Sequence, residues 1–200
     1  MRRLLHVGCG LKRRDGTTRG FAGAGWTETR LDVASDVRPD IVGSITDMSM
    51  IPSGSFDGVY SSHVLEHLFA HDVITALQEC RRVLSPRGVM VLTCPDMQAA
   101  AKEIAEGRLL EPMYQSEAGP VAAIDMVFGL RWAIKDGHVH MAHRSGFTLP
   151  VLGGLLSGVG FGQVMVTSRG HPFYDLWAVA ANWQATEDEM RELAGAHFPV

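Results

Sequence analysis

Apolar and mixed segments alternate along most of the chain. Residues 4–7 form a short apolar run that stops at glycine, and residues 89–93 form a nearly continuous one. Both patterns predict strands that are buried on two faces, as in a parallel sheet. Further strands are predicted by shorter apolar runs between turn-forming residues, at residues 29–33, 41–42, 56–61, 164–167 and 176–181.

Segments whose apolar residues have helical spacing lie between many of these predicted strands. One apolar face repeats at intervals of four, three and four residues, through Val73, Leu77, Cys80 and Leu84. Asp72 is expected to cap the start of this helix. Thr186 followed by Glu189 predicts a capping box for a last helix. Other helices are predicted over residues 97–106, from Pro120 onward, and over residues 149–159.

Strands that alternate with helices predict an α/β sheet covered on both faces. Because crossovers between parallel strands are right-handed, the sheet is expected to be doubly wound. The 200 residues suit a single domain, residues 1–200. Residues 107–146 fit this pattern least well, since residues 107–119 look irregular and residues 138–146 form a His-rich loop.

Amino-acid composition and net charge limit which kinds of molecule the protein is expected to bind. The chain is 46% hydrophobic and 20% charged, which is ordinary for a globular protein. The net charge of −4 leaves no basic excess for a phosphate backbone, so we expect no nucleic-acid partner. The three widely spaced cysteines favour a reducing, cytoplasmic compartment, and no apolar stretch predicts membrane insertion.

The turn Gly8-Cys9-Gly10 directly follows the first predicted strand. In a doubly wound sheet ligands bind beyond the carboxyl ends of the strands, and glycine lets the backbone approach a ligand closely. Alone, such a turn is equally consistent with a plain strand end. Lys12 and its neighbours stand where a dinucleotide-binding sequence has its third glycine, and no helix begins there, so NAD is disfavoured.

Two carboxylates follow the next strands. Asp32 ends the second strand, where it could accept hydrogen bonds from both hydroxyls of a ribose. The alternative is a solvated or capping aspartate. Asp47 follows the third strand and could accept from an adenine amino group, or could simply be a turn residue.

Five segments together resemble the class I S-adenosylmethionine-dependent methyltransferases, in the order that these proteins have. They are residues 5–10 (LHVGCG), 31–33 (LDV), 45–48 (ITDM), 56–68 (FDGVYSSHVLEHL) and 82–88 (RVLSPRG). The resemblance covers residues 4–96 strongly. It extends more weakly to Gly160-Phe161 and Trp177-Ala178-Val179, which look like the closing hairpin of the same fold.

The resemblance implies a Rossmann-like, seven-stranded sheet, mostly parallel with an antiparallel closing strand and helices on both faces. It implies S-adenosylmethionine as the cofactor. By the family's pattern the cofactor contacts would come from the glycine turn, the two carboxylates and the end of the fourth strand, that is from Gly8, Cys9, Gly10, Asp32, Asp47, Ser61, Ser62 and His63.

Methyl transfer to a hydroxyl needs a base. His63 and His67 are candidates, and His63 is preferred as the catalytic residue because it lies nearer the strand end. The family often has His67 in a structural Glu-His pair. Cys9 is not expected to be a nucleophile, since nothing near it in sequence would activate a thiolate.

The run from His138 to His143 holds three imidazoles. His138 and His140 would share one side of an extended segment, and His143 could approach through a turn. No cysteine or carboxylate completes an evident ligand set, so pocket lining or structure is favoured and no metal is predicted.

The sequence departs from the family in two places. Residues 11–31 lack the usual amphipathic first helix, and almost nothing precedes the first strand to cap a substrate pocket. We therefore expect a lid from residues 107–146 or from a second subunit of a homodimer. The predicted function is methylation of oxygen or nitrogen on a small-molecule or glycan-type acceptor. The alternative is a non-catalytic protein that binds S-adenosylmethionine or a nucleotide on a degenerate fold.

Overall fold

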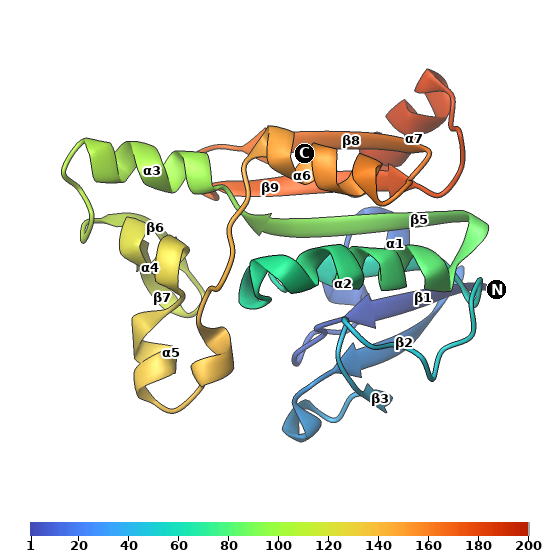
Figure 1. Ribbon diagram of the computed structural model, residues 1–200, viewed down its shortest axis with the longest axis horizontal. Helices are drawn as coiled ribbons and strands as arrows, with labels where there is room; N and C mark the ends of the chain where they lie inside the picture. The colour runs from blue at the N-terminus through green and yellow to red at the C-terminus, as the bar shows by residue number, and fades with distance from the viewer. Residues whose placement is uncertain (200) are drawn as a thin grey trace.

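Seven strands form one sheet (Figure 1), in the order β3 (Ile41–Val42), β2 (Trp26–Asp32), β1 (Arg2–Val7), β4 (Phe56–Ser62), β5 (Leu84–Pro95), β9 (Asp175–Ala181) and β8 (Gln163–Arg169). The computed structural model describes residues 1–199. The first five strands in this order are parallel, whereas β9 is antiparallel to both β5 and β8. The expected doubly wound sheet with an antiparallel closing strand is confirmed.

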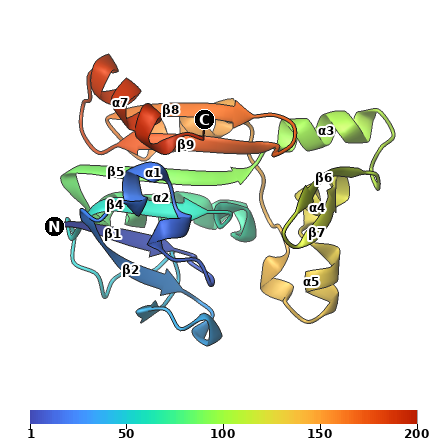
Figure 2. The ribbon, with the colours of Figure 1, turned by 180° about the vertical axis from the view of Figure 1, so that it is seen from behind.

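Helices cover both faces of the sheet. On one face lie α2 (Ala70–Val83) and α6 (Leu149–Gly158), and on the other lie α1 (Arg19–Ala22) and α7 (Glu187–His197) (Figures 1 and 2). Strand order reverses between β1 and β4. Because all strands from β3 to β5 point the same way, the carboxyl ends of β1, β2 and β4 open at one edge, where ligands bind in such sheets.

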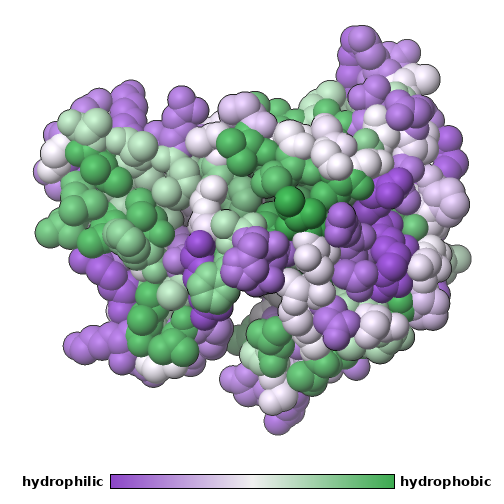
Figure 3. All heavy atoms as spheres, in the orientation of Figure 1, coloured by the Kyte–Doolittle hydropathy of each residue, from purple (hydrophilic) through white to green (hydrophobic). Residues whose placement is uncertain are grey.

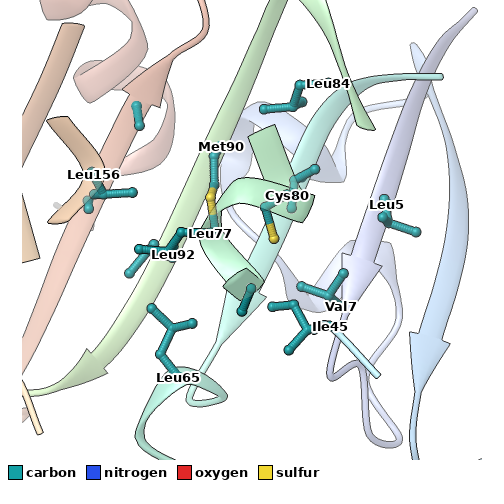
Figure 4. Close-up of a cluster of buried hydrophobic side chains, with 14 of the residues drawn as sticks. Leu5, Val7, Ile45, Leu65, Leu77, Cys80, Leu84, Met90, Leu92 and Leu156 are labelled. Carbon is teal, nitrogen blue, oxygen red and sulfur yellow. The ribbon is translucent and has the colours of Figure 1, made fainter. Parts of the chain in front are cut away.

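The larger hydrophobic core lies between the sheet and the layer formed by α2 and α6. Leu77 and Cys80 of α2 face Met90 and Leu92 of β5, and all four side chains are at most 1% exposed (Figure 4). Burial of one such large apolar side chain is worth roughly 1.5–3 kcal/mol. This core fixes the position of β4, which ends at the predicted site.

The sequence predicts capping residues for the starts of α7 and α2, and only the first prediction holds. The capping box of α7 is confirmed, because Thr186 Oγ1 accepts from the Glu189 amide and the Glu189 carboxylate accepts from the Thr186 amide. The cap predicted for α2 is wrong. The helix begins about one turn earlier, with Phe69 as N-cap, and Asp72 lies in its first turn. A negative charge there still interacts favourably with the helix dipole.

The connection after β1 contains little regular structure, as the sequence indicates. It forms a 3₁₀ turn, η1 (Arg14–Gly16), and the single turn of α1. The side chain of Phe21 in α1 is fully buried against Trp26 and Tyr60. One aromatic anchor thus takes the place of an amphipathic helix on this face.

Residues 107–146 contain more regular structure than expected. A hairpin of β6 (Pro112–Ser116) and β7 (Gly119–Ala122) is followed by α4 (Ala123–Phe128), α5 (Arg131–Lys135) and the 3₁₀ turn η4 (Val139–Met141). The helix predicted from Pro120 onward begins only at Ala123, since Pro120 lies in β7. With α3 (Met97–Ala105), residues 107–146, here called the insertion, form a small apolar cluster of their own beyond the carboxyl edge of the sheet (Figure 1).

The packing of α7 on α1 contains a buried imidazole. His197 is 5% exposed, lies against Phe21 and pairs with the Thr18 hydroxyl at 2.6 Å. Burial, with a smaller contribution from the positive charge of Arg2, lowers the pKa of His197 to about 4. The folded protein therefore holds this imidazole neutral at pH values where the unfolded chain binds a proton.

This burial predicts an acid-sensitive α7. The lowered pKa has no effect on stability above pH 6.5, the ordinary pKa. As the pH falls from 6.5 toward 4, protonation of the unfolded chain lowers the free energy of unfolding, by up to about 3 kcal/mol. Urea unfolding at pH 7 and pH 4.5 should show a larger loss for the wild type than for His197→Gln, which cannot titrate. Parallel pH dependences for the two proteins would contradict this account.

Candidate functional site

The chain turns sharply at the end of β1. Gly8 and Gly10 have φ angles of +61° and +51°, in the left-handed region that glycine tolerates best. A Cβ atom on Gly8 would lie 2.3 Å from Cγ2 of Val64, so the turn packs directly against the segment that follows β4. Cys9 between them is buried, and burial raises the pKa of its thiol. This is consistent with the expectation that Cys9 is not a nucleophile.

Asp32 ends β2 beside this turn. Its carboxylate accepts hydrogen bonds from the Gly10 amide at 2.8 Å and the Ala34 amide at 2.9 Å, one on each oxygen. Each oxygen keeps a further lone pair. The side chain is 9% exposed and lines a cavity of about 550 Å³, here called the glycine-turn cavity.

Some of the other predicted site residues line this cavity, and others do not. Gly8, Gly10, Asp32 and His63 line it, together with Ser44 and Ile45 after β3. Asp47 does not line it and is exposed; its carboxylate instead accepts from the Ser49 amide. Hydrogen bonding to the Ser49 side chain, followed by this amide, lowers the pKa of Asp47. The structure therefore places Asp47 as a turn residue, the alternative that the sequence left open, because the chain bends away from the cavity after Ile45.

Arg30 organises the walls of the glycine-turn cavity. Its side chain is 2% exposed, and its guanidinium donates to backbone carbonyl oxygens of Lys12 at 3.2 Å, Arg38 at 2.9 Å, and Gly10. One buried cation thus joins the glycine turn to the loop around the 3₁₀ turn η2 (Ser35–Val37). Sequence reasoning missed this residue, since a lone arginine within a predicted strand gives no sign of such partners.

Of the three residues predicted as cofactor contacts at the end of β4, only His63 is well exposed. His63 follows the strand with a φ of +54°, and its side chain is 45% exposed. Ser61 is 1% exposed, and the Ser62 hydroxyl pairs with the Thr93 hydroxyl at 3.0 Å. Neither serine lines the glycine-turn cavity, whereas His63 does.

A second cavity, of about 480 Å³, lies between the sheet edge and the insertion, and is called the insertion cavity. Its walls combine the segment after β4, the insertion and the β8–β9 hairpin, with lining residues that include His63, Glu66, His67, Tyr114, Val121, His143 and Asp175. His63, His67 and Met141 line both cavities. Figure 3 shows a notch in the surface between the insertion and the body of the molecule.

Opposed charges lie where the two cavities meet. His63 Nδ1 is 3.2 Å from Oε1 of Glu66, whose side chain is 2% exposed. Partial desolvation by the surrounding protein opposes a charge on His63, but the Glu66 carboxylate outweighs this effect, so the pKa of His63 is raised. Burial also opposes the charge on Glu66, and His63 and His67 outweigh it, so the pKa of Glu66 is lowered. The pKa of His67 is lowered, mainly by burial.

The histidines predicted as one run separate in the structure. His138 and His140 are neighbours, with ring centroids 5.8 Å apart. His143 instead lies against His67, with ring centroids 5.0 Å apart. The 3₁₀ turn η4 between His138 and His143 turns them in different directions, which spacing along an extended segment could not predict.

Comparison with known families gives a match over the first part of the chain. Residues 5–92, from β1 to β5, match the family described as methyltransferase domain. The match includes the glycine turn, Asp32 and the His63 segment. Over these residues the chain is similar to a methyltransferase domain.

Solved structures extend this methyltransferase likeness to nearly the whole chain. A protein from Pyrococcus horikoshii has a TM-score of 0.61 at 15% identity, over 90% of this chain and 81% of that one. A methyltransferase from Methanosarcina mazei has a TM-score of 0.60 at 15% identity, over 92% and 93%. At these identities the likeness establishes the fold.

A third structure carries ligands. The 1,6-didemethyltoxoflavin-N1-methyltransferase of Burkholderia thailandensis, with 1,6-didemethyltoxoflavin and S-adenosylhomocysteine bound, has a TM-score of 0.56 at 16% identity, over 91% of this chain and 71% of that one. No curated protein sequence is significantly similar to this chain. Among residues 1–199, no helix has the length and apolar character that crossing a membrane requires.

The role of Arg30 predicts a large effect of its loss. Arg30→Met leaves three partly buried backbone carbonyls without their donor and removes the guanidinium that links the two loops, and we expect a loss of about 3 kcal/mol in unfolding free energy. In a domain of this size that corresponds to a fall in Tm of roughly 6–12 °C. Arg13→Met, at an exposed position in the loop to which Arg30 donates, serves as the matched control in thermal unfolding. Equal Tm values for the two variants would contradict the assigned role.

Proposed function

We propose that this chain catalyses methyl transfer from S-adenosylmethionine, bound in the glycine-turn cavity, to an acceptor in the insertion cavity. The observation that carries the proposal is that the two cavities meet at His63 and His67. A methyl donor and an acceptor in adjoining cavities can be held in line, and such positioning supplies much of the acceleration of a two-substrate reaction.

Several features of the glycine-turn cavity suit this cofactor. Asp32 has lone pairs free for the two ribose hydroxyls, and the side-chain-free backbone of Gly8 and Gly10 lets a ligand approach. Ser44 and Ile45 replace Asp47 as the residues that we assign to the adenine end. A volume of about 550 Å³ lies within the usual range for small-molecule sites. S-adenosylmethionine supplies an electrophilic methyl group on a sulfonium, and the Burkholderia neighbour holds its demethylated product.

His63 is our proposed base. Its imidazole lies where the cavities meet, and the buried Glu66 carboxylate beside it stabilises the positive charge that the ring gains when it takes a proton. Small-molecule or glycan-type acceptors with a hydroxyl or an amine fit a cavity of about 480 Å³. The insertion, residues 107–146, serves as the lid in this proposal, and a homodimer is not needed to close the site.

Cofactor binding can be measured without knowing the acceptor. S-adenosylhomocysteine at a hundred times its dissociation constant stabilises a folded protein by about 2.7 kcal/mol, which raises Tm by roughly 5–10 °C here. Asp32→Ala and the milder Asp32→Asn should reduce this rise, whereas Asp36→Ala, an exposed aspartate four residues away, should retain it. No rise in the wild type at millimolar ligand would refute the proposal, and an unchanged rise in both Asp32 variants would refute the ribose contact.

Turnover separates the enzyme from the alternative of a non-catalytic binding protein. With panels of hydroxyl and amine acceptors, we expect acceptor-dependent formation of S-adenosylhomocysteine. His63→Asn should slow it by roughly 100-fold or more while the Tm rise with S-adenosylhomocysteine persists. Binding without acceptor-dependent product across both panels would favour the non-catalytic alternative.

A further inference from the structure

Three potential metal ligands converge on the wall of the insertion cavity. Glu66, His67 and His143 each offer one ligand atom, and these atoms all lie within 4.8 Å of one another. Glu66 and His67 come from the 3₁₀ turn η3 (Leu65–His67), whereas His143 follows η4, far along the chain. Two imidazoles and one carboxylate with open positions form a ligand set that suits first-row transition metals.

The Glu66 carboxylate lacks the partners that such a buried group needs. Both of its oxygens are buried, and neither accepts a hydrogen bond from any residue between 1 and 199. The 3.2 Å approach of His63 is an ion pair without the alignment of a hydrogen bond. Leaving a buried carboxylate without hydrogen bonds is costly, and a bound cation removes that cost.

Both imidazoles are oriented with one nitrogen free. His67 Nδ1 lies 3.3 Å from the carbonyl oxygen of Ala142, and His143 Nδ1 lies 2.8 Å from that of Met126. Since a carbonyl oxygen only accepts, each Nδ1 carries the proton and each Nε2 keeps its lone pair. Outer hydrogen bonds of this kind hold metal-binding histidines in the correct tautomer.

The two segments that supply the ligands are tied together by backbone hydrogen bonds. The amides of Arg144 and Ser145 both donate to the Glu66 carbonyl, at 2.7 and 3.2 Å, and the Ser145 hydroxyl donates to the Leu65 carbonyl at 3.0 Å. The His143 amide donates to the carbonyl of Phe128 at 3.1 Å. The ligand cluster is therefore preorganised and does not depend on the chance approach of mobile side chains.

We infer that Glu66, His67 and His143 bind one divalent transition-metal ion of the Zn²⁺ class, with an open coordination position toward the insertion cavity. Three protein ligands plus an open position is the arrangement of reactive rather than structural zinc sites. The open position would take an oxygen from a hydroxylated acceptor. This last clause rests on the proposed function, whereas the metal site itself does not.

Metal binding to the untagged, metal-free full chain tests the site directly. Calorimetric titration with Zn²⁺ should give one site per chain, and Co²⁺ should give the visible absorption of a site with nitrogen ligands. All three cysteines are buried and offer no competing surface site. Mg²⁺, which prefers oxygen ligands, should bind far more weakly.

Variants identify the ligands. His143→Ala and Glu66→Gln should each weaken Zn²⁺ binding by at least about 100-fold, since loss of an outer partner alone costs about 10–100-fold. The exposed His138→Ala is the matched control and should bind as the wild type does. If Glu66→Gln fails to fold, as circular dichroism would show, His143→Ala carries the test.

Two results would overturn the inference: the absence of a single Zn²⁺ site in the wild type, or loss of binding in His138→Ala with retention in His143→Ala. The readout is independent of the cofactor. If the protein binds S-adenosylhomocysteine but no Zn²⁺, the proposed function stands and the metal site is refuted. If it binds Zn²⁺ but no S-adenosylhomocysteine, the metal site stands and the proposed function is refuted.

Discussion

The buried guanidinium of Arg30 is the interaction on which the shape of the site depends. It donates to backbone carbonyls of the glycine turn and of the loop around η2, two irregular segments on either side of Asp32. The connection after β1 contains only one turn of α-helix, so helix packing cannot position the glycine turn. A cation that satisfies several carbonyls at once holds the turn open toward the cavity instead, at the cost of burying a charge.

The topology of the sheet and the path of the insertion position His63 and the insertion cavity. Strand order reverses between β1 and β4, which brings the glycine turn and His63 to the same edge. The insertion returns after η4 and binds to η3 through the Glu66 carbonyl, so the second cavity closes around His67 and His143. His63 and His67 consequently face both compartments, which is the geometry that transfer between two bound molecules requires.

Much of this arrangement could be predicted from sequence, for a physical reason. Buried parallel strands leave nearly continuous apolar runs, and the residues directly after them, Gly8, Asp32 and His63, must meet at one edge. Long-range contacts leave no such local signal. The partners of Arg30, the turn of the chain that excludes Asp47, and the pairing of His143 with His67 in place of His138 all depend on loop conformations that periodicity does not encode.

A crystal structure with S-adenosylhomocysteine bound tests the central claim most directly. We expect both ribose hydroxyls on the Asp32 carboxylate and the ligand's sulfur directed toward His63, at the junction of the glycine-turn and insertion cavities. A ligand that occupies the cavity with its sulfur directed away from His63, or that binds elsewhere on the molecule, would contradict the account.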